Sequence, residues 1–144
     1  MKIAECMTPD VRIASPTQTL QQAAQTMAEV DAGVLPVAEG DRLVGMITDR
    51  DITIRAVAQG HGPDALVKDV MTTEVLYTYD DEDVANVLRN MGDIKVRRLP
   101  VVNRDKRLVG IISLSDMCAG GERPAQDTLR QIAQPGGPHS QTIH

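Results

Sequence analysis

An internal repeat constrains the fold of this chain more than any other feature. LPV at residues 35–37 returns at 99–101, a displacement of 64 positions, and RLVG at 42–45 returns at 107–110, a displacement of 65. The displacement grows by one residue in the turn between the two motifs, where an insertion is well tolerated. The sequence therefore predicts two copies of one structural unit.

Both copies show the same order of hydrophobic patterns. In the first, apolar residues recur with helical spacing up to Val30, and two apolar runs flank the turn residues Glu39, Gly40 and Asp41. The predicted elements of the first copy are a strand at 11–14, a helix ending near 30, strands at 33–37 and 42–48, and a helix from 49 to about 58. Those of the second copy are a strand at 75–79, a helix at 80–91, strands at 97–102 and 107–113, and a helix from 114.

The predicted fold class is α/β (α+β), with two β-α-β-β-α repeats packed sheet to sheet about a pseudo-twofold axis. Each repeat has about 55 residues, too few to bury a comfortable core alone, so the repeats are expected to pair. The expected domains are residues 1–62 and 63–119, and residues 120–144 are expected to form a tail with one or two helical turns.

Composition excludes several classes of function. The chain has two tyrosines, no Phe and no Trp, so its core must be aliphatic. A formal net charge of −5 disfavours general nucleic-acid binding, which needs clustered cations. No apolar run approaches the roughly 20 residues of a membrane span, and the N-terminus lacks a secretory h-region, so a cytoplasmic location is expected.

Metal and catalytic chemistry find little support in the sequence. Cys6 and Cys118 are too far apart for a CxxC motif and are expected to be reduced thiols, unless the fold brings the chain ends together. His61, His139 and His144 have no partners at metal-ligand spacing. Because no nucleophile–base pair is apparent either, no metal site, no required cofactor and no enzyme activity are expected.

A hydroxyl-x-x-Asp motif follows the last strand of each repeat, with Thr48 and Asp51 in the first and Ser113 and Asp116 in the second. One interpretation is a helix capping box, in which each side chain satisfies a backbone N–H. The other is a ligand site, since a carboxylate can accept hydrogen bonds from a ribose diol while the N-terminus of a helix binds a phosphate. Repetition at equivalent places favours the second interpretation, and the two roles are compatible.

The ordered motifs MTP, LPV and RLVGMITDRD, followed by MTT, RRLPVV and RLVGIIS, resemble a tandem pair of CBS (cystathionine-β-synthase) domains. The resemblance covers residues 1–119 and is closest to small stand-alone bacterial CBS-pair proteins. It implies a homodimer and regulatory binding of adenosine ligands (AMP, ADP, ATP, less often NAD or S-adenosylmethionine) in up to two clefts, each drawing on both repeats.

The resemblance also implies the residues of each cleft. The first cleft would consist of Met46, Thr48, Asp51, Val75, Leu76, Arg97, Arg98 and Pro100. The second would consist of Val11, Arg12, Val34, Pro36, Arg50, Ile111, Ser113 and Asp116. In each, the aspartate would hold the ribose and the arginines the phosphate.

The two clefts are expected to differ in affinity. Arg97 and Arg98 precede LPV in the second repeat, whereas Gly33 and Val34 occupy those positions in the first. The Asp51 cleft is therefore predicted to bind more tightly, because charge-assisted phosphate contacts are strong. The predicted function is a non-catalytic sensor of adenine nucleotides that signals to an effector protein. The alternative is a structural or interaction dimer whose clefts stay empty.

Overall fold

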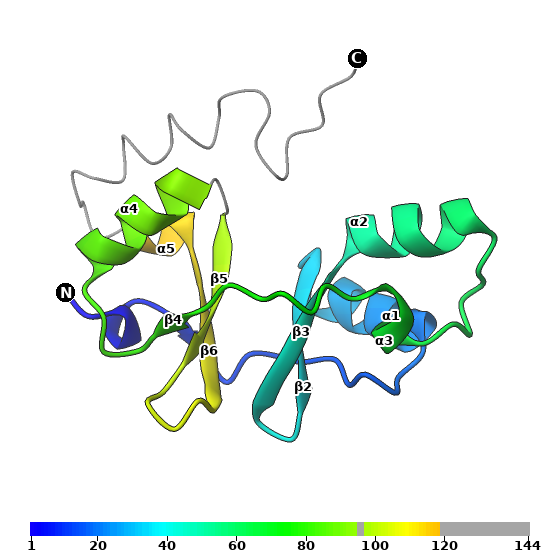
Figure 1. Ribbon diagram of the computed structural model, residues 1–144, viewed down its shortest axis with the longest axis horizontal. Helices are drawn as coiled ribbons and strands as arrows, with labels where there is room; N and C mark the ends of the chain where they lie inside the picture. The colour runs from blue at the N-terminus through cyan, green and yellow to red at the C-terminus, as the bar shows by residue number, and fades with distance from the viewer. Residues whose placement is uncertain (95–96, 119–144) are drawn as a thin grey trace, which may run out of the picture. The chain divides into compact units, whose positions relative to one another are not determined.

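The computed structural model describes residues 1–94 and 97–118, which form two compact units (Figure 1). Unit 2 consists of Val11–Val75 with 106–108, and unit 1 consists of Met1–Asp10, Leu76–Asp105 and the residues from Val109 onward. The predicted tail helix, the two C-terminal histidines and the side chain of Cys118 lie outside the described part.

Unit 2 is built on a β-hairpin covered by helices. Its elements are α1 (Leu20–Val30), β2 (Val34–Glu39), β3 (Arg42–Thr48), α2 (Asp49–Asp51), η2 (Ile52–Ala56), η3 (Val57–Gln59) and α3 (Val67–Val70). The strands pair antiparallel, with Leu35 opposite Ile47. Both side chains are buried in a core that also contains Leu20, Ala23 and Met27 from the predicted apolar face of α1.

The helix predicted from residue 49 to about 58 is continuous but irregular. It begins as α-helix, passes through a π-helical turn at Ile52–Ala56, and closes with a 3-10 turn. It ends where Gly60 adopts a left-handed conformation with φ of 84°, as the Gly-rich segment predicted. The strand predicted at 11–14 is reduced to a single parallel bridge between Ala14 and Val37.

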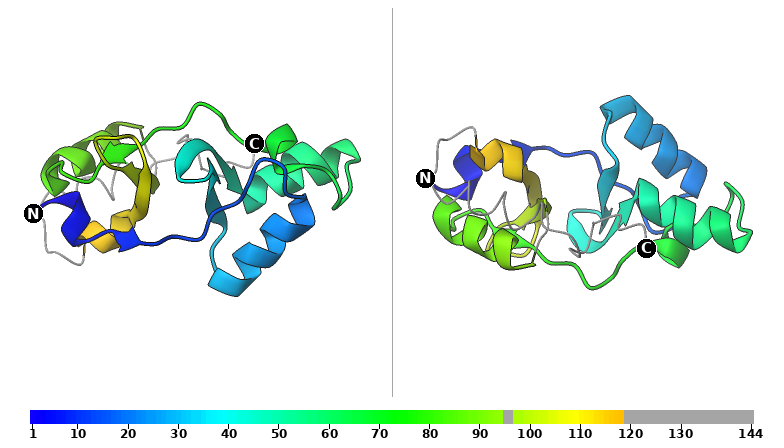
Figure 2. Two further views of the ribbon diagram at one scale, coloured as in Figure 1. Left: turned by 90° about the horizontal axis from the view of Figure 1, so that it is seen from below. Right: turned by 90° about the horizontal axis from the view of Figure 1, so that it is seen from above.

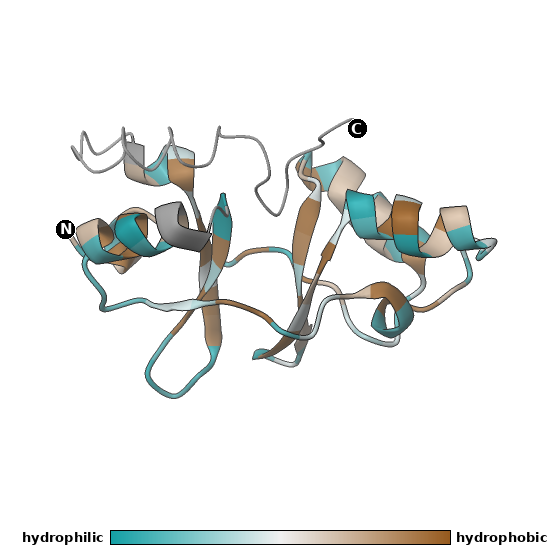
Figure 3. Ribbon diagram, turned by 45° about the horizontal axis from the view of Figure 1, so that its top comes forward, coloured by the Kyte–Doolittle hydropathy of each residue, from teal (hydrophilic) through white to brown (hydrophobic). Residues whose placement is uncertain are grey.

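Unit 1 holds a four-stranded sheet in the order β1-β6-β5-β4. Its elements are η1 (Ile3–Glu5), β1 (Thr8–Pro9), β4 (Thr78–Tyr79), α4 (Val84–Ile94), β5 (Arg98–Val102), β6 (Leu108–Ser113) and α5 (Leu114–Cys118). The predicted strand at 75–79 is shortened to β4, which pairs parallel with β5. The strands of both sheets are largely apolar, while the turn between β5 and β6 is hydrophilic (Figure 3).

The N-terminal ten residues fold with the second repeat, not with the first. Ile3 is completely buried in a cluster with Leu88, Ile112 and Met117, and β1 pairs with β6. Both views in Figure 2 show this blue segment among the elements that follow residue 76. Unit 1 therefore contains a segment that precedes its repeat core in the chain, whereas the equivalent segment of unit 2, residues 63–75, follows its core.

Equivalent hydrogen bonds attach this segment in both units. The amide of Ile3 donates to the Glu82 carbonyl at 3.0 Å, and the amide of Val67 donates to the Gln18 carbonyl at 2.9 Å. These pairs correspond under the displacement of 64 residues. The repeat seen in the sequence is thus reproduced in the backbone hydrogen bonds that join segments far apart in the chain.

The glycine of the RLVG motif lets the MT segment approach the sheet. A Cβ atom on Gly110 would lie 2.6 Å from the Thr8 carbonyl oxygen, and one on Gly45 would lie 2.9 Å from the Thr72 carbonyl oxygen. Real Cβ atoms do not come so close to backbone atoms. The repeated glycine and the repeated MT motif therefore contact each other, once in each unit.

Candidate functional site

In unit 2 the junction between β3 and α2 fixes the Asp51 carboxylate by a reciprocal cap. The amide of Asp51 donates to the Thr48 hydroxyl at 3.0 Å, and the Thr48 amide donates to Asp51 Oδ2 at 3.0 Å. The predicted capping box is thus confirmed. Oδ1 of Asp51 accepts no hydrogen bond from the described residues, so the cap uses one carboxylate oxygen and leaves the other available.

In unit 1 the junction between β6 and α5 has the same geometry. The amide of Asp116 donates to the Ser113 hydroxyl at 3.1 Å, and the Ser113 amide donates to Asp116 Oδ2 at 2.9 Å. Ser113 and Ser115 also share a hydroxyl–hydroxyl hydrogen bond of 2.9 Å. Each repeat therefore presents a half-buried aspartate whose Oδ2 is held by a hydrogen bond at the start of a helix.

Other predicted site residues of unit 2 share one face of its hairpin. Val34 lies opposite Thr48 and Pro36 lies opposite Met46 in the ladder. Directly opposed residues in an antiparallel pair project to the same face. Because Leu35 and Ile47 fill the core on the other face, these four residues lie on the face turned away from that core.

The equivalent face of unit 1 carries its predicted site residues. Leu99 and Ile112 belong to the core cluster. Alternation along β5 and β6 therefore places their sequence neighbours on the opposite face. These neighbours are Arg98, Pro100, Ile111 and Ser113. Pro100 is buried, Ile111 and Ser113 are half-buried, and Arg98 is exposed.

The members of each predicted cleft are distributed over the two units. For the Asp51 cleft, Met46, Thr48, Asp51 and Val75 lie in unit 2, and Leu76, Arg97, Arg98 and Pro100 lie in unit 1. For the Asp116 cleft, Val11, Arg12, Val34, Pro36 and Arg50 lie in unit 2, and Ile111, Ser113 and Asp116 lie in unit 1. Among residues of one predicted cleft that share a unit, the structure brings Thr48 to Asp51 and Ser113 to Asp116.

The predicted phosphate-binding arginines differ in their contacts. Arg12 forms an ion pair with Glu29 on α1, with its Nη2 2.9 Å from Glu29 Oε2. Arg97 and Arg98 are exposed, and neither side chain forms an ion pair within residues 1–94 and 97–118. The arginines assigned to the Asp51 cleft therefore have no competing carboxylate there.

A contact between positions 33 and 49 distinguishes the first repeat from the second at the place of Arg97. A Cβ atom on Gly33 would lie 2.6 Å from Asp49 Oδ2. The Asp49 amide donates to the Gly33 carbonyl at 2.9 Å, just as the Leu114 amide donates to the Arg97 carbonyl at 2.8 Å. The two repeats share this backbone hydrogen bond, but it joins Gly33 to Asp49 in the first repeat and Arg97 to Leu114 in the second.

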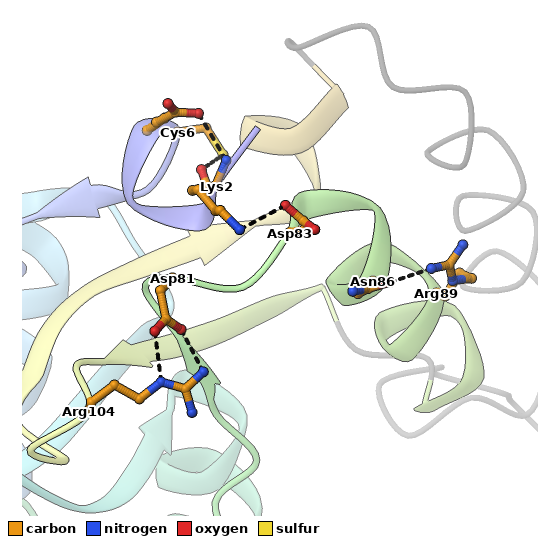
Figure 4. Close-up of polar contacts among 8 residues, drawn as sticks. Lys2, Cys6, Asp81, Asp83, Asn86, Arg89 and Arg104 are labelled. Atoms are coloured by element: carbon orange, nitrogen blue, oxygen red, sulfur yellow. Dashed lines mark hydrogen bonds and ion pairs between the residues drawn. The ribbon is translucent and has the colours of Figure 1, made fainter.

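Sequence reasoning missed two further groups of charged residues. Arg55 lies one helical turn after Asp51, with its Nε 3.7 Å from Asp51 Oδ1, a spacing that an i,i+4 search would have found. Arg104 binds Asp81 through two hydrogen bonds of 2.8 and 2.7 Å (Figure 4). Its Cζ lies 4.1 Å from the centre of the Tyr79 ring. The side-chain hydrogen bond from Arg104 lowers the pKa of Asp81 below its ordinary value.

Neither a metal centre nor a membrane span appears in the part of the chain that the structure describes. No three His, Cys, Asp or Glu side chains there are grouped so that they could hold a metal ion. None of the helices in these ranges has the length and hydrophobicity needed to cross a bilayer.

Comparison with known proteins agrees with the repeat and the fold. The CBS domain model matches residues 3–57 and again residues 67–120. The CBS domain-containing protein YhcV of Bacillus subtilis (strain 168) is 38% identical over 115 residues, which are 80% of this chain and 81% of YhcV.

Solved structures extend the comparison to ligand complexes. CBSX2 in complex with AMP aligns with a TM-score of 0.73 at 25% identity, covering 83% of this chain and 95% of that one. The CBS domain pair of MJ0100, in complex with 5′-methylthioadenosine and S-adenosyl-L-methionine, aligns with a TM-score of 0.73 at 27% identity, covering 84% and 97%. The predicted mixed α/β class with two repeats is confirmed, and the chain belongs to the CBS domain family as a tandem pair of these domains.

Proposed function

We propose that this CBS pair is a non-catalytic regulatory module that binds adenine nucleotides, AMP foremost and also ADP, ATP or NAD. Asp51 and Asp116 would each accept hydrogen bonds from a ribose diol, and the assigned arginines would bind phosphate. No cofactor is required, because the nucleotide is a regulatory ligand. The ligand complexes of CBSX2 and MJ0100 support an adenosine ligand of this kind.

One observation carries this proposal: at both junctions the cap hydrogen bond to the aspartate is made to Oδ2 and not to Oδ1. A helix cap needs one acceptor oxygen, and the cap hydrogen bonds of 3.0 and 2.9 Å are made to Oδ2 in both repeats. Within the described residues, Oδ1 of each aspartate accepts no hydrogen bond. A pre-oriented carboxylate oxygen at a helix start suits a vicinal diol next to a phosphate.

A regulatory role further requires that the nucleotide bind one conformation of the protein better than another. The proposed module is a homodimer in the cytoplasm, and an effector protein responds to the conformation that the ligand favours. The module thus acts through binding alone.

The test replaces each aspartate by asparagine. The amide oxygen of Asp51→Asn or Asp116→Asn can still accept the cap hydrogen bond, whereas the amide nitrogen replaces Oδ1 with a donor. We expect the free energy of unfolding to change by less than about 1 kcal/mol, while affinity for AMP at the altered site falls at least tenfold by isothermal titration. Loss of a hydrogen bond between a ligand and an oriented charged acceptor typically weakens binding by a factor of this size or more.

The same titrations rank the two sites and test the alternative. Asp116→Asn isolates the Asp51 site, and Asp51→Asn isolates the other, so the tighter AMP binding should remain in Asp116→Asn. The cap geometry favours one second candidate, a structural or interaction dimer in which these motifs only stabilise helices. That candidate predicts no heat of binding for AMP, ADP, ATP, NAD or S-adenosylmethionine at millimolar concentration, a result that would overturn the proposed function.

A further inference from the structure

Arg55 connects the Asp51 junction to the end of helix α3. Its Nε lies 3.7 Å from Asp51 Oδ1, and its Nη1 donates to the Val70 carbonyl oxygen at 3.3 Å. The side chain is thus held at two points, a carboxylate on its own helix and the last carbonyl of another. Helix ends leave such carbonyls without intrahelical partners, and an arginine is a common partner for them.

The contact with Asp51 involves the oxygen that the cap does not use. Thr48 occupies Oδ2, and the Arg55 cation lies beside Oδ1. At 3.7 Å the guanidinium attracts the carboxylate but is too far away for a hydrogen bond. The lone pairs of Oδ1 therefore remain available to a ligand, while the cation restricts rotation of the carboxylate about its terminal bond.

Burial makes this ion pair stronger than an ordinary surface contact. The Asp51 side chain is only 14% exposed, although that of Arg55 is 53% exposed. Ion pairs between two exposed side chains contribute little, but screening is weaker where one partner is mostly buried. The hydrogen bond to the Val70 carbonyl already orders the Arg55 side chain, so the contact with Asp51 costs little additional side-chain entropy.

In the described part of the chain, the second junction has no counterpart of this arginine. The displacement of 65 residues that carries Asp51 onto Asp116 carries Arg55 onto Gly120, which has no side chain to supply a charge. Within residues 1–94 and 97–118, the Asp116 carboxylate forms no ion pair. The two aspartates therefore share a cap but differ in their electrostatic surroundings.

We propose that Arg55 is a positioning residue that orients the Asp51 carboxylate for a vicinal diol, which gives the Asp51 site greater selectivity for ribose over deoxyribose. This inference rests on the proposed function. A diol donates two hydrogen bonds, and both can be well aligned only if the carboxylate plane is fixed. A 2′-deoxyribose lacks one of the two donors and gains less from that orientation.

The test compares AMP with 2′-deoxy-AMP by isothermal titration in an Asp116→Asn background, so that only the Asp51 site is observed. In Arg55→Gln we expect the ratio of the two affinities to fall about threefold, the size of effect typical for a modest ion pair. Arg55→Lys keeps the charge and should retain part of the ratio. A general loss of stability would weaken both ligands equally and leave the ratio unchanged.

Arg104→Gln serves as the matched control, because it also removes an exposed arginine that pairs with an aspartate, but in unit 1. Its ratio should equal that of the parent protein. An unchanged ratio in Arg55→Gln, with AMP still favoured over 2′-deoxy-AMP in the parent, would overturn the role of Arg55 and leave the proposed function intact. If the parent binds neither nucleotide, the proposed function itself is wrong.

Discussion

At the scale of single residues, close backbone contact explains glycines that hydropathy leaves unexplained. Gly45 and Gly110 end the RLVG motifs, and each faces the MT segment that pairs antiparallel with its strand, residues 71–72 and 7–8 respectively. The sequence shows that these glycines repeat, but it does not show what lies above them, because the partner segment is more than twenty residues away in the chain. Only the fold reveals that the motif is a point of contact.

Replacing Gly110 by alanine should destabilise the protein. The new methyl group would lie 2.6 Å from the Thr8 carbonyl oxygen and 2.8 Å from Met7 Sδ, so β1 would have to move away from β6. We expect a loss of about 1–3 kcal/mol in the free energy of unfolding, measured by urea denaturation. Gly62→Ala is the control, since its nearest neighbour is the end of the Asp64 side chain at 3.1 Å. Equal effects of the two substitutions would refute this explanation.

Asp51 and Asp116 show how far residue-level prediction can reach. The capping interpretation was correct, because a capping box depends on residues three positions apart and can be recognised locally. The assignment of these aspartates to nucleotide clefts remains a prediction. The i,i+4 spacing of Asp51 and Arg55 can be recognised locally, but the contact of Arg55 with the Val70 carbonyl joins residues fifteen positions apart and leaves no periodic signal.

At the scale of elements, helices with a clear apolar face were predicted well, but short edge elements were not. Leu20, Ala23 and Met27 are buried on α1 as their spacing indicated. The strand predicted at 75–79 contributes only two residues to the sheet, and η1 and β1 were not predicted. Two- and three-residue elements depend on hydrogen bonds to distant segments, which local patterns do not encode.

The edge strand β4 is stabilised by a charged cluster whose effect should depend on pH. Arg104 binds Asp81 and also stacks on Tyr79 of β4. Since the pKa of Asp81 is lowered in the folded protein, the ionised carboxylate stabilises the fold above the ordinary aspartate pKa. This contribution must disappear as the pH falls through the lowered pKa, where the carboxylate is protonated in both states.

Asp81→Asn removes the titrating group and leaves the arginine on its ring. We expect the wild type to be more stable than this variant at pH 7, and the two unfolding free energies to converge in acid. Asp105→Asn, in the same turn, alters a carboxylate that has no ion pair in the described residues and should show no such convergence. A difference between wild type and Asp81→Asn that persists unchanged at low pH would contradict the assignment.

At the scale of the whole molecule, the units that fold are offset from the repeats that the sequence displays. The segment 63–75 stays with unit 2, and its equivalent at the N-terminus joins unit 1. The repeat count, strand pairs and main helices were all predicted from sequence. The offset was not, since the two equivalent segments carry the same motifs and nothing local shows which copy each one contacts.

Two fragments of nearly equal length test the offset. A fragment of residues 11–75 contains the MT segment that crosses Gly45, whereas a fragment of residues 1–62 replaces it with the segment that belongs to unit 1. By far-UV circular dichroism and urea titration, we expect the 11–75 fragment to keep more helix and a steeper transition. If the 1–62 fragment unfolds as cooperatively as the 11–75 fragment, the segment 63–75 is not needed for unit 2 to fold.

The contact between Gly33 and Asp49 also couples these two positions in any comparison of the repeats. A Cβ atom at position 33 would lie 2.6 Å from Asp49 Oδ2, so a larger residue there requires the Asp49 side chain to turn away. In the second repeat the corresponding positions hold Arg97 and Leu114, joined by the same backbone hydrogen bond. Positions 33 and 49 should therefore be exchanged together when one repeat is converted into the other.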